Sequence, residues 1–447
     1  MSPDAVWPTG TELIAISALR PYARNARTHS RKQIKKIAAS IDRFGFVNPV
    51  LVDQGNRIIA GHGRVAAAKL LGWPEVPVLR IEHLDESEKR AYILADNRLA
   101  EEAGWDEEIL AIELQGLLEI DFSIELTGFD MVEIDTVLDD AAKAAESGPD
   151  AADEIPPMSP DATPVTRPGD LFALGSHRLF CGDATQESSY ATLLGGARAS
   201  IIFTDPPYNV PIDGHVSGLG KHRHREFAMA SGEMTSEQFT DFLETVFDHL
   251  ARYSTDGSIH YICMDWRHMP EVLAAGESCY AELKNLCVWV KVNGGMGTFY
   301  RSRHELVFAF KNGTGTHINN FELGQGGRYR TNVWEYAGAN SFGHERDAEL
   351  AMHPTVKPVA MVADALRDCS KRKQIVLDPF GGSGTTLIAA QKTGRRAYLI
   401  ELDPLYCDTI VRRWEAFTGK KARHVGEDFS FAALAERRAD EPLAAET

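Results

Sequence analysis

The sequence predicts a two-domain protein in which a smaller α+β domain precedes a larger α/β domain. Two observations predict the α/β domain. Residues 374–401 contain a strand, a glycine-rich turn, a helix and a second strand in succession, and residues 201–204 form another buried-strand run. A third observation, the acidic segment 139–170 rich in Ala, Pro, Asp and Ser, separates this half from an N-terminal half of helices and short strands.

Composition excludes several classes of protein. The 447 residues are 44% hydrophobic and 25% charged, which allows packed cores and excludes collagen-like, wholly disordered and disulfide-stapled chains. No run of 18 apolar residues occurs, so no membrane partner is expected. The N-terminus shows no secretory signal. Six scattered cysteines without a CxxC pair predict reduced thiols in a cytoplasmic protein and no metal site.

The net charge of −17 is distributed unevenly along the chain. Residues 101–170 hold 20 acidic and 2 basic residues, whereas residues 1–100 hold 15 basic and 10 acidic residues. The total charge therefore does not exclude a DNA partner, because nucleic-acid binding depends on local patches. One such candidate is a basic run without an intervening acid, which is either a solvated face or a phosphate-contacting surface: Arg20, Arg24, Arg27, Arg31, Lys32, Lys35 and Lys36.

In the N-terminal half, residues 30–45 carry apolar side chains at helical spacing and residues 50–60 are predicted to form a hairpin. Gly61-His62-Gly63-Arg64 then opens a further helix that ends at Gly72, and the strand-like run VPVLRI follows. Residues 101–138 continue as acidic amphipathic helices.

This arrangement, over residues 11–100, resembles the ParB/sulfiredoxin-like N-terminal domain. Partition proteins of that family carry a G-E-R-R box that handles a nucleoside triphosphate, and only Gly61 and Arg64 match it here. The resemblance therefore implies a DNA- or partner-binding module without nucleotide hydrolysis, although a helix N-terminus with glycines is an anion site in principle. His62 is alternatively a structural turn residue.

The first chemical signal of the C-terminal half is Asp205-Pro206-Pro207-Tyr208, directly after the strand run at 201–204. The prolines end the strand and remove two N–H donors. A carboxylate, peptide carbonyls and an aromatic ring remain, and this set suits a planar exocyclic amine. Asp205 and the Pro206 carbonyl can each accept one N–H, while Tyr208 can stack on the heterocycle. The alternative is an ordinary loop.

The second signal is a glycine-rich turn between two strands, comprising Asp378, Phe380, Gly381, Gly382, Ser383, Gly384, Thr385 and Thr386. Twenty residues separate Gly381 from Glu401, the spacing at which nucleotide-binding α/β units place an acid against ribose hydroxyls. No lysine follows the glycines, and G-x-G-x-x-G is absent. The pattern therefore favours a nucleoside cofactor such as S-adenosyl-L-methionine.

Together, the two motifs resemble the beta class of amino-group DNA methyltransferases, in which the catalytic motif precedes the cofactor motif. The resemblance spans about residues 168–425. It assigns Asp183 to the cofactor adenine and Lys357, within His353–Pro358, to the cofactor side. The segment that contains Trp289, Lys291, Arg301, Arg303, His304 and Glu305 is similar to the region that shapes the target pocket, and Arg303 is expected to contact DNA.

The resemblance implies a doubly wound, mostly parallel sheet with one antiparallel hairpin. It also implies methyl transfer from S-adenosyl-L-methionine to the exocyclic amine of a base extruded from double-stranded DNA, without a metal. Adenine N6 is favoured, and cytosine N4 stays open because its amine has the same geometry. Two different functions also stay open: a ParB-like DNA-binding protein with an inactive methyltransferase domain, and methylation of a protein amide or RNA amine. A homodimer and a place in a restriction–modification system are left open.

The loop at 214–225 combines glycines, three histidines and the bases Lys221, Arg223 and Arg225. Cations repel a metal, so a mobile loop that contacts DNA phosphates is predicted, with a plain solvated loop as the alternative.

The predicted organisation is a ParB-like domain at 1–138, a flexible acidic linker at 139–167, a methyltransferase domain at 168–435 and a disordered tail at 436–447.

Overall fold

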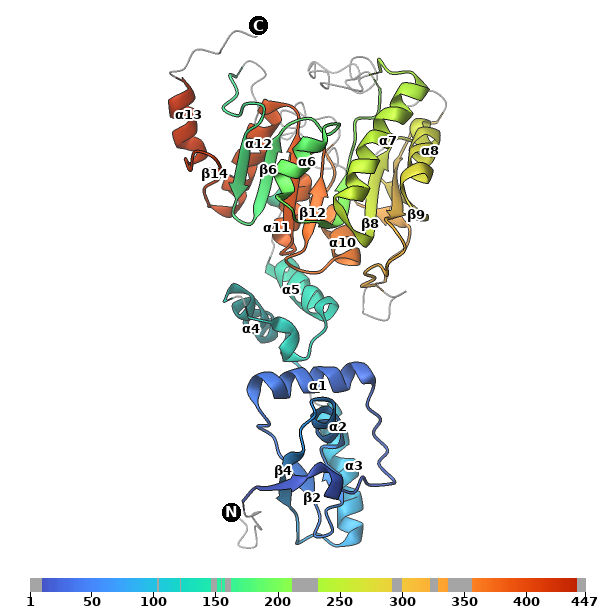
Figure 1. Cartoon of the computed structure of the whole chain (residues 1–447), viewed down its shortest axis with the longest axis vertical. Helices are drawn as coiled ribbons and strands as arrows, with labels where there is room; N and C mark the ends of the chain where they lie inside the picture. The colour runs from blue at the N-terminus through green and yellow to red at the C-terminus, as the bar shows by residue number, and fades with distance from the viewer. Residues whose placement is uncertain are drawn as a thin grey trace. The chain divides into compact units, whose positions relative to one another are not determined.

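The computed structural model describes residues 10–102, 104–120, 122–145, 151–153, 155–156, 162–210, 232–291, 300–321, 329–336 and 356–439. The chain divides into two compact units between residues 145 and 146. Figure 1 traces the elements of both units from the N-terminus in blue to the C-terminus in red.

The N-terminal unit contains a four-stranded sheet in the order β1-β4-β2-β3. β2 pairs antiparallel with β3, as the predicted hairpin requires, and parallel with β4, which pairs antiparallel with β1. The strands are β1 (Glu12–Ala15), β2 (Val50–Val52), β3 (Ile58–Ala60) and β4 (Glu75–Arg80). The helices are α1 (Arg31–Phe44), α2 (His62–Leu70), α3 (Glu86–Glu102), α4 (Glu107–Glu119) and α5 (Met131–Ala145), with 3-10 turns η1 (Ile16–Ala18) and η2 (Ile124–Thr127).

Capping side chains determine where these helices begin. The Ser30 side chain accepts the N–H of Gln33 at the start of α1, and Asp106 accepts the N–H of Ile109 at the start of α4. α2 begins differently, after Gly61 in the left-handed conformation with φ 101°. The helix predicted at 30–45 is thus present as α1, and the helix predicted to open at Gly61–Arg64 and end at Gly72 is present as α2.

The C-terminal unit is built on a ten-stranded sheet in the order β11-β9-β10-β8-β7-β12-β13-β6-β5-β14. The central strands β8, β7, β12, β13 and β6 are mutually parallel, and β9–β10 is the expected antiparallel hairpin. The antiparallel pairings of β5 with β6 and β14 were not predicted. The strands are β5 (Leu171–Leu174), β6 (His177–Cys181), β7 (Ala199–Thr204), β8 (Ser254–Met264), β9 (Glu282–Val290), β10 (His304–Lys311), β11 (Val333–Glu335), β12 (Ile375–Asp378), β13 (Arg396–Glu401) and β14 (Arg423–His424).

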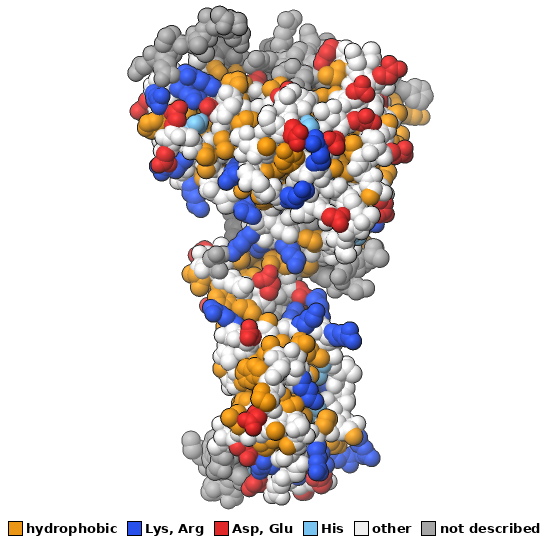
Figure 2. All heavy atoms as spheres, in the orientation of Figure 1, with side chains coloured by type: hydrophobic (Ala, Val, Ile, Leu, Met, Phe, Trp, Pro, Cys, Tyr) orange, Lys and Arg blue, Asp and Glu red, His pale blue; other side chains and the backbone are white. Residues whose placement is uncertain are grey.

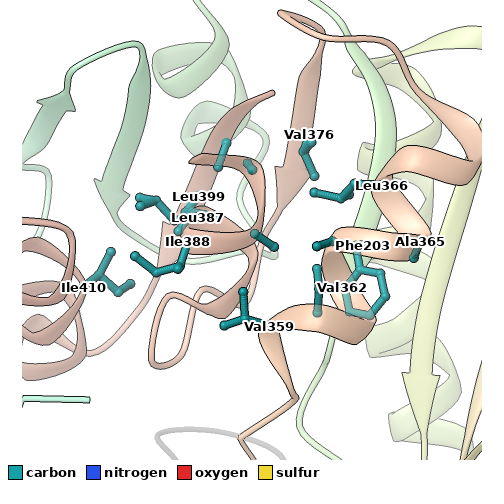
Figure 3. Close-up of a cluster of buried hydrophobic side chains, with 14 of the residues drawn as sticks. Phe203, Val359, Val362, Ala365, Leu366, Val376, Leu387, Ile388, Leu399 and Ile410 are labelled. Atoms are coloured by element: carbon teal, nitrogen blue, oxygen red, sulfur yellow. The ribbon is translucent and has the colours of Figure 1, made fainter. Parts of the chain in front are cut away.

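Helices cover both faces of this sheet, which confirms the doubly wound fold. One buried cluster joins Val362, Leu387 and Ile410, from three helices, to Val376 of β12 (Figure 3). The neighbouring Leu377 belongs to a second cluster on the opposite face, because successive strand residues point to opposite sides. The first face carries α10 (Val359–Cys369), α11 (Thr385–Lys392) and α12 (Pro404–Thr418), and the second carries α6 (Glu187–Leu194), α7 (Ser236–Arg252) and α8 (Met269–Cys279). The remaining elements are η3 (Ala151–Asp153), η4 (Trp266–His268) and α13 (Phe431–Ala439).

The structure corrects the predicted linker at 139–167 in part. α5 continues to Ala145, because its alanine-rich end favours helix. Further along, the Arg413 side chain donates to the Ala152 carbonyl at 2.8 Å, and the Thr166 N–H donates to the Asp408 carboxylate at 2.9 Å. Buried charged side chains of α12 therefore hold segments whose composition alone predicts disorder.

The predicted tail at 436–447 is corrected in the same way over its first residues. α13 extends to Ala439, and Arg438 forms an ion pair with the buried Asp170 and donates to the Val165 carbonyl at 2.7 Å. Within the described residues, no helix is long and apolar enough to cross a membrane.

Candidate active site

The Asp-Pro-Pro-Tyr motif lies at the carboxyl end of β7. β7 pairs in parallel with β12, so the segment after Thr204 lies beside the turn after Asp378. The Thr204 hydroxyl donates to the Asp378 carboxylate at 2.8 Å and links the two strand ends. Asn209, with φ 51°, ends the motif, and its side chain accepts the N–H groups of Gly232 and Met234. The backbone on both sides of the motif is therefore held in place.

Both carboxylate oxygens of Asp205 have a protein partner. The Tyr208 hydroxyl donates to Oδ1 at 2.6 Å, and the Lys357 ammonium donates to Oδ2 at 2.6 Å. Lys357 also donates to the Tyr208 oxygen at 3.1 Å. The Lys357 side chain is only 4% exposed, whereas that of Asp205 is 23% exposed. The lysine is therefore almost completely shielded from solvent, whereas the carboxylate that it contacts is partly accessible.

Glu305 joins this cluster from β10. Its Oε2 lies 2.9 Å from the Lys357 ammonium and 3.3 Å from the Tyr208 hydroxyl, while its Oε1 accepts from Lys291. Two carboxylates and two ammonium groups thus form one charge-balanced network. The Lys357 ammonium also lies 5.4 Å from the ring centroid of Tyr208 and 5.9 Å from that of Trp289, within cation–π range of both.

Burial and charge act in opposite directions on the two carboxylates. Burial raises the pKa of Asp205; Lys357 opposes this rise, and Glu305 adds to it. Burial alone would also raise the pKa of Glu305, but Lys357 and Lys291 outweigh it and lower the pKa to about 2. Glu305 is therefore ionised at every physiological pH. Burial raises the pKa of the Tyr208 hydroxyl well above its usual value, so the phenol stays protonated.

The glycine-rich turn is held by buried acidic side chains. Asp378 accepts the Thr386 hydroxyl at 2.7 Å and the Phe380 N–H at 3.1 Å, in addition to Thr204. Gly384 precedes α11 with φ 83°, and a side chain there would approach Ile410 to 3.2 Å. Glycine is thus required at this position by both backbone and space.

Glu401 completes the turn from the end of β13. Its carboxylate accepts the N–H of Gly382 at 2.7 Å and that of Asp403 at 2.9 Å. Burial raises the pKa of Glu401 to about 7, although these two N–H groups oppose it; burial likewise raises the pKa of Asp378 to about 7. Asp183 follows β6 beside it, since the Gly182 N–H donates to the Glu401 carbonyl.

The structure brings most of the predicted site residues to one edge of the sheet, with one difference of detail. Lys357, grouped with the cofactor side by resemblance, contacts Asp205 and Tyr208. Arg303 pairs with the Lys291 backbone, donating from Nε to its carbonyl at 3.2 Å. Lys221, Arg223 and Arg225 lie outside the described residues. Within the described residues, no cluster of three metal-ligating side chains is found.

Sequence reasoning gave no role to Glu305 and Lys291, although it included both in the target-pocket region. A signal was present: each is a charged residue at the end of an apolar strand run, VWVK and HELVFAF. A charged side chain at the end of a buried strand must either reach solvent or pair with an opposite charge or a hydrogen-bonding group. What the sequence does not contain is the antiparallel register that places His304 opposite Val290 and so brings the two strand ends together.

The basic run of the N-terminal unit is partly used within that unit. Lys32 and Lys36 both form ion pairs with Asp130, at 2.8 and 2.7 Å. Arg27 donates to Asn97. The remaining bases, which are exposed, are Arg20, Arg24, Arg31 and Lys35. Figure 2 shows basic and acidic side chains interspersed on the visible face of this unit.

The turn at Gly61–Arg64 also uses its polar side chains locally. Arg64 donates to the Pro49 carbonyl at 3.2 Å, and the His62 ring accepts the Tyr22 N–H at 3.3 Å. Burial lowers the pKa of His62, and the charge of the nearby His29 lowers it further, so the ring is neutral at physiological pH. The polar side chains of the turn are thus bound within the N-terminal unit.

Comparison with known families and proteins agrees with this two-part organisation. Residues 6–98 match the ParB N-terminal domain, residues 108–168 the ParB-methyltransferase HTH domain and residues 199–412 the DNA methylase family. The helix-turn-helix match was not predicted; it begins in the acidic helices and extends over the proposed linker.

Three similar proteins illustrate the two halves. The ParB-like nuclease domain-containing protein YnaK of Escherichia coli is 48% identical over 75 residues, which cover 17% of this chain and 86% of YnaK. The type II methyltransferase M.ScaI of Streptomyces caespitosus is 37% identical over 90 residues, 20% of this chain and 30% of that protein. The M1.HpyAVI–SAM complex aligns with 53% of this chain and 97% of its own at 20% identity, with a TM-score of 0.40.

Proposed function

The chain belongs to the DNA methylases of the N6/N4 class and carries a ParB N-terminal domain ahead of the methylase, and from this premise we propose that it methylates adenine at N6 in double-stranded DNA. S-adenosyl-L-methionine is the methyl donor of the class. The target base is extruded from the duplex, because its amine is otherwise buried in the base stack. The cytoplasm is the proposed location.

The observation that carries the proposal is the position of Asp205. Asp205 directly follows the last residue of β7, and 23% of its side chain is exposed. The preceding Thr204 is hydrogen-bonded to Asp378, which begins the glycine-rich turn. An amine held at Asp205 and a nucleoside cofactor held at Gly381–Glu401 would therefore meet at one edge of the sheet.

In this mechanism Asp205 is the catalytic residue. Its carboxylate accepts an N–H of the target amine, and the Pro206 carbonyl accepts the other, which directs the nitrogen lone pair out of ring conjugation. The Tyr208 ring stacks on the base. A carboxylate fixed at the developing ammonium stabilises the transition state, which we expect to contribute about 3–4 kcal/mol. The methylated nitrogen then releases one proton to solvent, which restores the neutral base.

The residues of the glycine-rich turn fit a nucleoside cofactor. Glu401 and Asp183 offer carboxylate acceptors, and the turn contains no basic residue between 378 and 386 that would recognise phosphate. When bound, S-adenosyl-L-methionine supplies an already activated methyl group. This chain's own role is to orient it: Glu401 toward the ribose hydroxyls, Asp183 toward the adenine, and Phe380 along the ring.

Adenine is proposed over cytosine because Asp occupies the first position of the Asp-Pro-Pro-Tyr motif, which favours adenine in the resembled class. Lys221, Arg223, Arg225 and Arg303 are proposed to contact DNA, and the ParB-like domain to add a second DNA-binding module.

The experiment is modified-base sequencing of DNA from cells that express the chain. We expect N6-methyladenine at one short sequence in these cells and none in cells that express Asp205→Ala. N4-methylcytosine at one sequence would move the proposal to the alternative base. Unmodified DNA together with active transfer to protein or RNA would overturn it.

A further inference from the structure

We propose that in the base-free enzyme the Lys357 ammonium occupies the place at Asp205 that the target amine takes during the reaction, and that Glu305 receives the ammonium when the base enters. Lys357 and Glu305 are then positioning residues that act through Asp205. This inference rests on the proposed function, because it concerns how the same carboxylate exchanges its partners.

The surroundings of Lys357 resemble those that an exocyclic amine requires. Its nitrogen donates to Asp205 Oδ2 at 2.6 Å. It also lies near the faces of two aromatic rings, 5.4 Å from the Tyr208 centroid and 5.9 Å from the Trp289 centroid. The bound target amine would likewise be an N–H donor on this carboxylate, close to aromatic rings. The lysine is thus an internal substitute for it.

Base binding therefore requires an exchange of hydrogen-bond partners. Tyr208 occupies one oxygen of Asp205 and Lys357 the other, so an entering amine must displace at least one of them. Lys357 is 4% exposed and cannot be hydrated where it lies. The Glu305 carboxylate, already 2.9 Å away, is the acceptor that can hold it after displacement.

The electrostatics of the reaction also require this displacement. Methyl transfer places positive charge on the amine nitrogen, and an ammonium group still bound to Asp205 would oppose that charge. Movement of Lys357 onto Glu305 frees Asp205 for the amine without changing the net charge of the cluster. Lys291, bound to the other oxygen of Glu305, keeps that carboxylate in place during the exchange.

A proton relay through the same groups is a less suitable explanation. It would need Glu305 to accept a proton that originates on the methylated amine. The pKa of Glu305 lies at about 2, because Lys357 and Lys291 outweigh its burial, so protonation at neutral pH is strongly unfavourable. Glu305 is better suited to be a permanent counter-charge.

The test is a double-mutant cycle of Glu305→Gln, Lys357→Met and the double variant, with methyl transfer measured on DNA that contains the site found by sequencing. In Glu305→Gln, Asp205 is the only carboxylate left to Lys357, so we expect kcat/KM to fall at least tenfold, mainly through KM for DNA. Removal of the competing ammonium in the double variant should raise kcat/KM at least threefold above its value in Glu305→Gln. Lys357→Gln replaces Lys357→Met if the methionine variant does not fold.

Two further readouts distinguish this role from a merely structural one. The acid limb of the pH profile of kcat/KM should move to lower pH in Glu305→Gln and to higher pH in Lys357→Met, because Glu305 raises and Lys357 lowers the pKa of Asp205. Fluorescence of 2-aminopurine placed beside the target adenine, measured without S-adenosyl-L-methionine, should show less base extrusion in Glu305→Gln and recovery in the double variant.

The outcomes separate this inference from the proposed function. If the wild-type chain methylates DNA but the double variant is as impaired as Glu305→Gln, or more, the exchange does not occur. Loss of S-adenosyl-L-methionine binding in Lys357→Met would instead make Lys357 a cofactor contact and overturn the inference. If the wild-type chain transfers no methyl group to any DNA, the proposed function itself fails.

Discussion

Two glycine turns, one in each unit, begin a helix in the same way but lie in different chemical surroundings. Gly61 precedes α2 with φ 101°, and Gly384 precedes α11 with φ 83°. Each carries the chain from a strand of the sheet into a helix. A helix N-terminus by itself favours an anion, because its first N–H groups are unpaired and the helix dipole is positive there.

The side chains around the two turns determine how differently they can act. At the second turn, the protein supplies the anion itself, since Glu401 accepts the Gly382 N–H at 2.7 Å. Phosphate is thereby disfavoured, and carboxylate acceptors remain for a nucleoside. At the first turn, Arg64 donates to Pro49 and His62 is neutral. The neighbouring side chains, more than the turn, therefore select the ligand.

The largest effect is expected outside both turns, at Asp205. Asp205→Ala should lower methyl transfer at least a few hundredfold, from a loss of about 3–4 kcal/mol in the transition state. S-adenosyl-L-methionine binding, measured by calorimetry, should hardly change, because the second turn is intact. Comparable losses of binding and transfer would show that the two sites are not separate.

A matched pair of substitutions compares the turns directly. Alanine at a positive φ costs about 1–2 kcal/mol. The new methyl group would also lie 3.2 Å from Ile410 in Gly384→Ala and 2.9 Å from the Arg64 side chain in Gly61→Ala. Gly384→Ala should lose roughly tenfold or more in cofactor affinity. Gly61→Ala should destabilise the N-terminal unit by a similar amount, yet leave cofactor affinity within about twofold. Calorimetry and thermal unfolding of the two variants provide the measurement.

The acidic lining of the second turn predicts a pH dependence. Burial raises the pKa of Glu401 to about 7, so the carboxylate gains a proton as the pH falls through 7 and loses acceptor capacity. The dissociation constant for S-adenosyl-L-methionine should therefore rise below pH 7, by at most about tenfold per pH unit. Glu401→Gln should bind weakly, with a flatter profile between pH 7 and 5.5. An unchanged wild-type profile would exclude a direct contact by the ionised carboxylate.

The smallest effects are expected in the N-terminal unit. Residues 1–145 alone should show no appreciable CTP or ATP turnover and should bind DNA weakly. Alanine at the exposed Arg24, Arg31 or Lys35 should reduce the slope of log affinity against log salt by about 0.9 for each DNA phosphate that the variant no longer neutralises. Lys32→Ala is the control, since Lys32 pairs with Asp130. Robust nucleotide turnover would contradict the contrast between the two turns.

Local patterns predicted much of this molecule. The helix expected between the glycine-rich turn and the second strand of residues 374–401 is α11 (Thr385–Lys392), and the motif at 205–208 follows a strand as predicted. Contacts between distant segments could not be predicted in the same way. Lys357 meets Asp205 across 152 residues, and only the order of the strands brings them together.

The contacts made by two parts of the predicted linker have the same origin. The composition of residues 139–167 predicts too little apolar burial to offset the entropy of ordering. It does not reveal that Asp408 and Arg413 of α12 satisfy the backbone of this segment at Thr166 and Ala152.

The central claim is that Asp205 presents an adenine amine to a methyl group held at the second turn. Its most direct test is mass spectrometry of nucleosides from DNA incubated with the purified chain and isotopically labelled S-adenosyl-L-methionine. We predict labelled N6-methyladenine with the wild-type chain and none above background with Asp205→Ala. Labelled N4-methylcytosine as the only product, or equal labelling by both proteins, would contradict the claim.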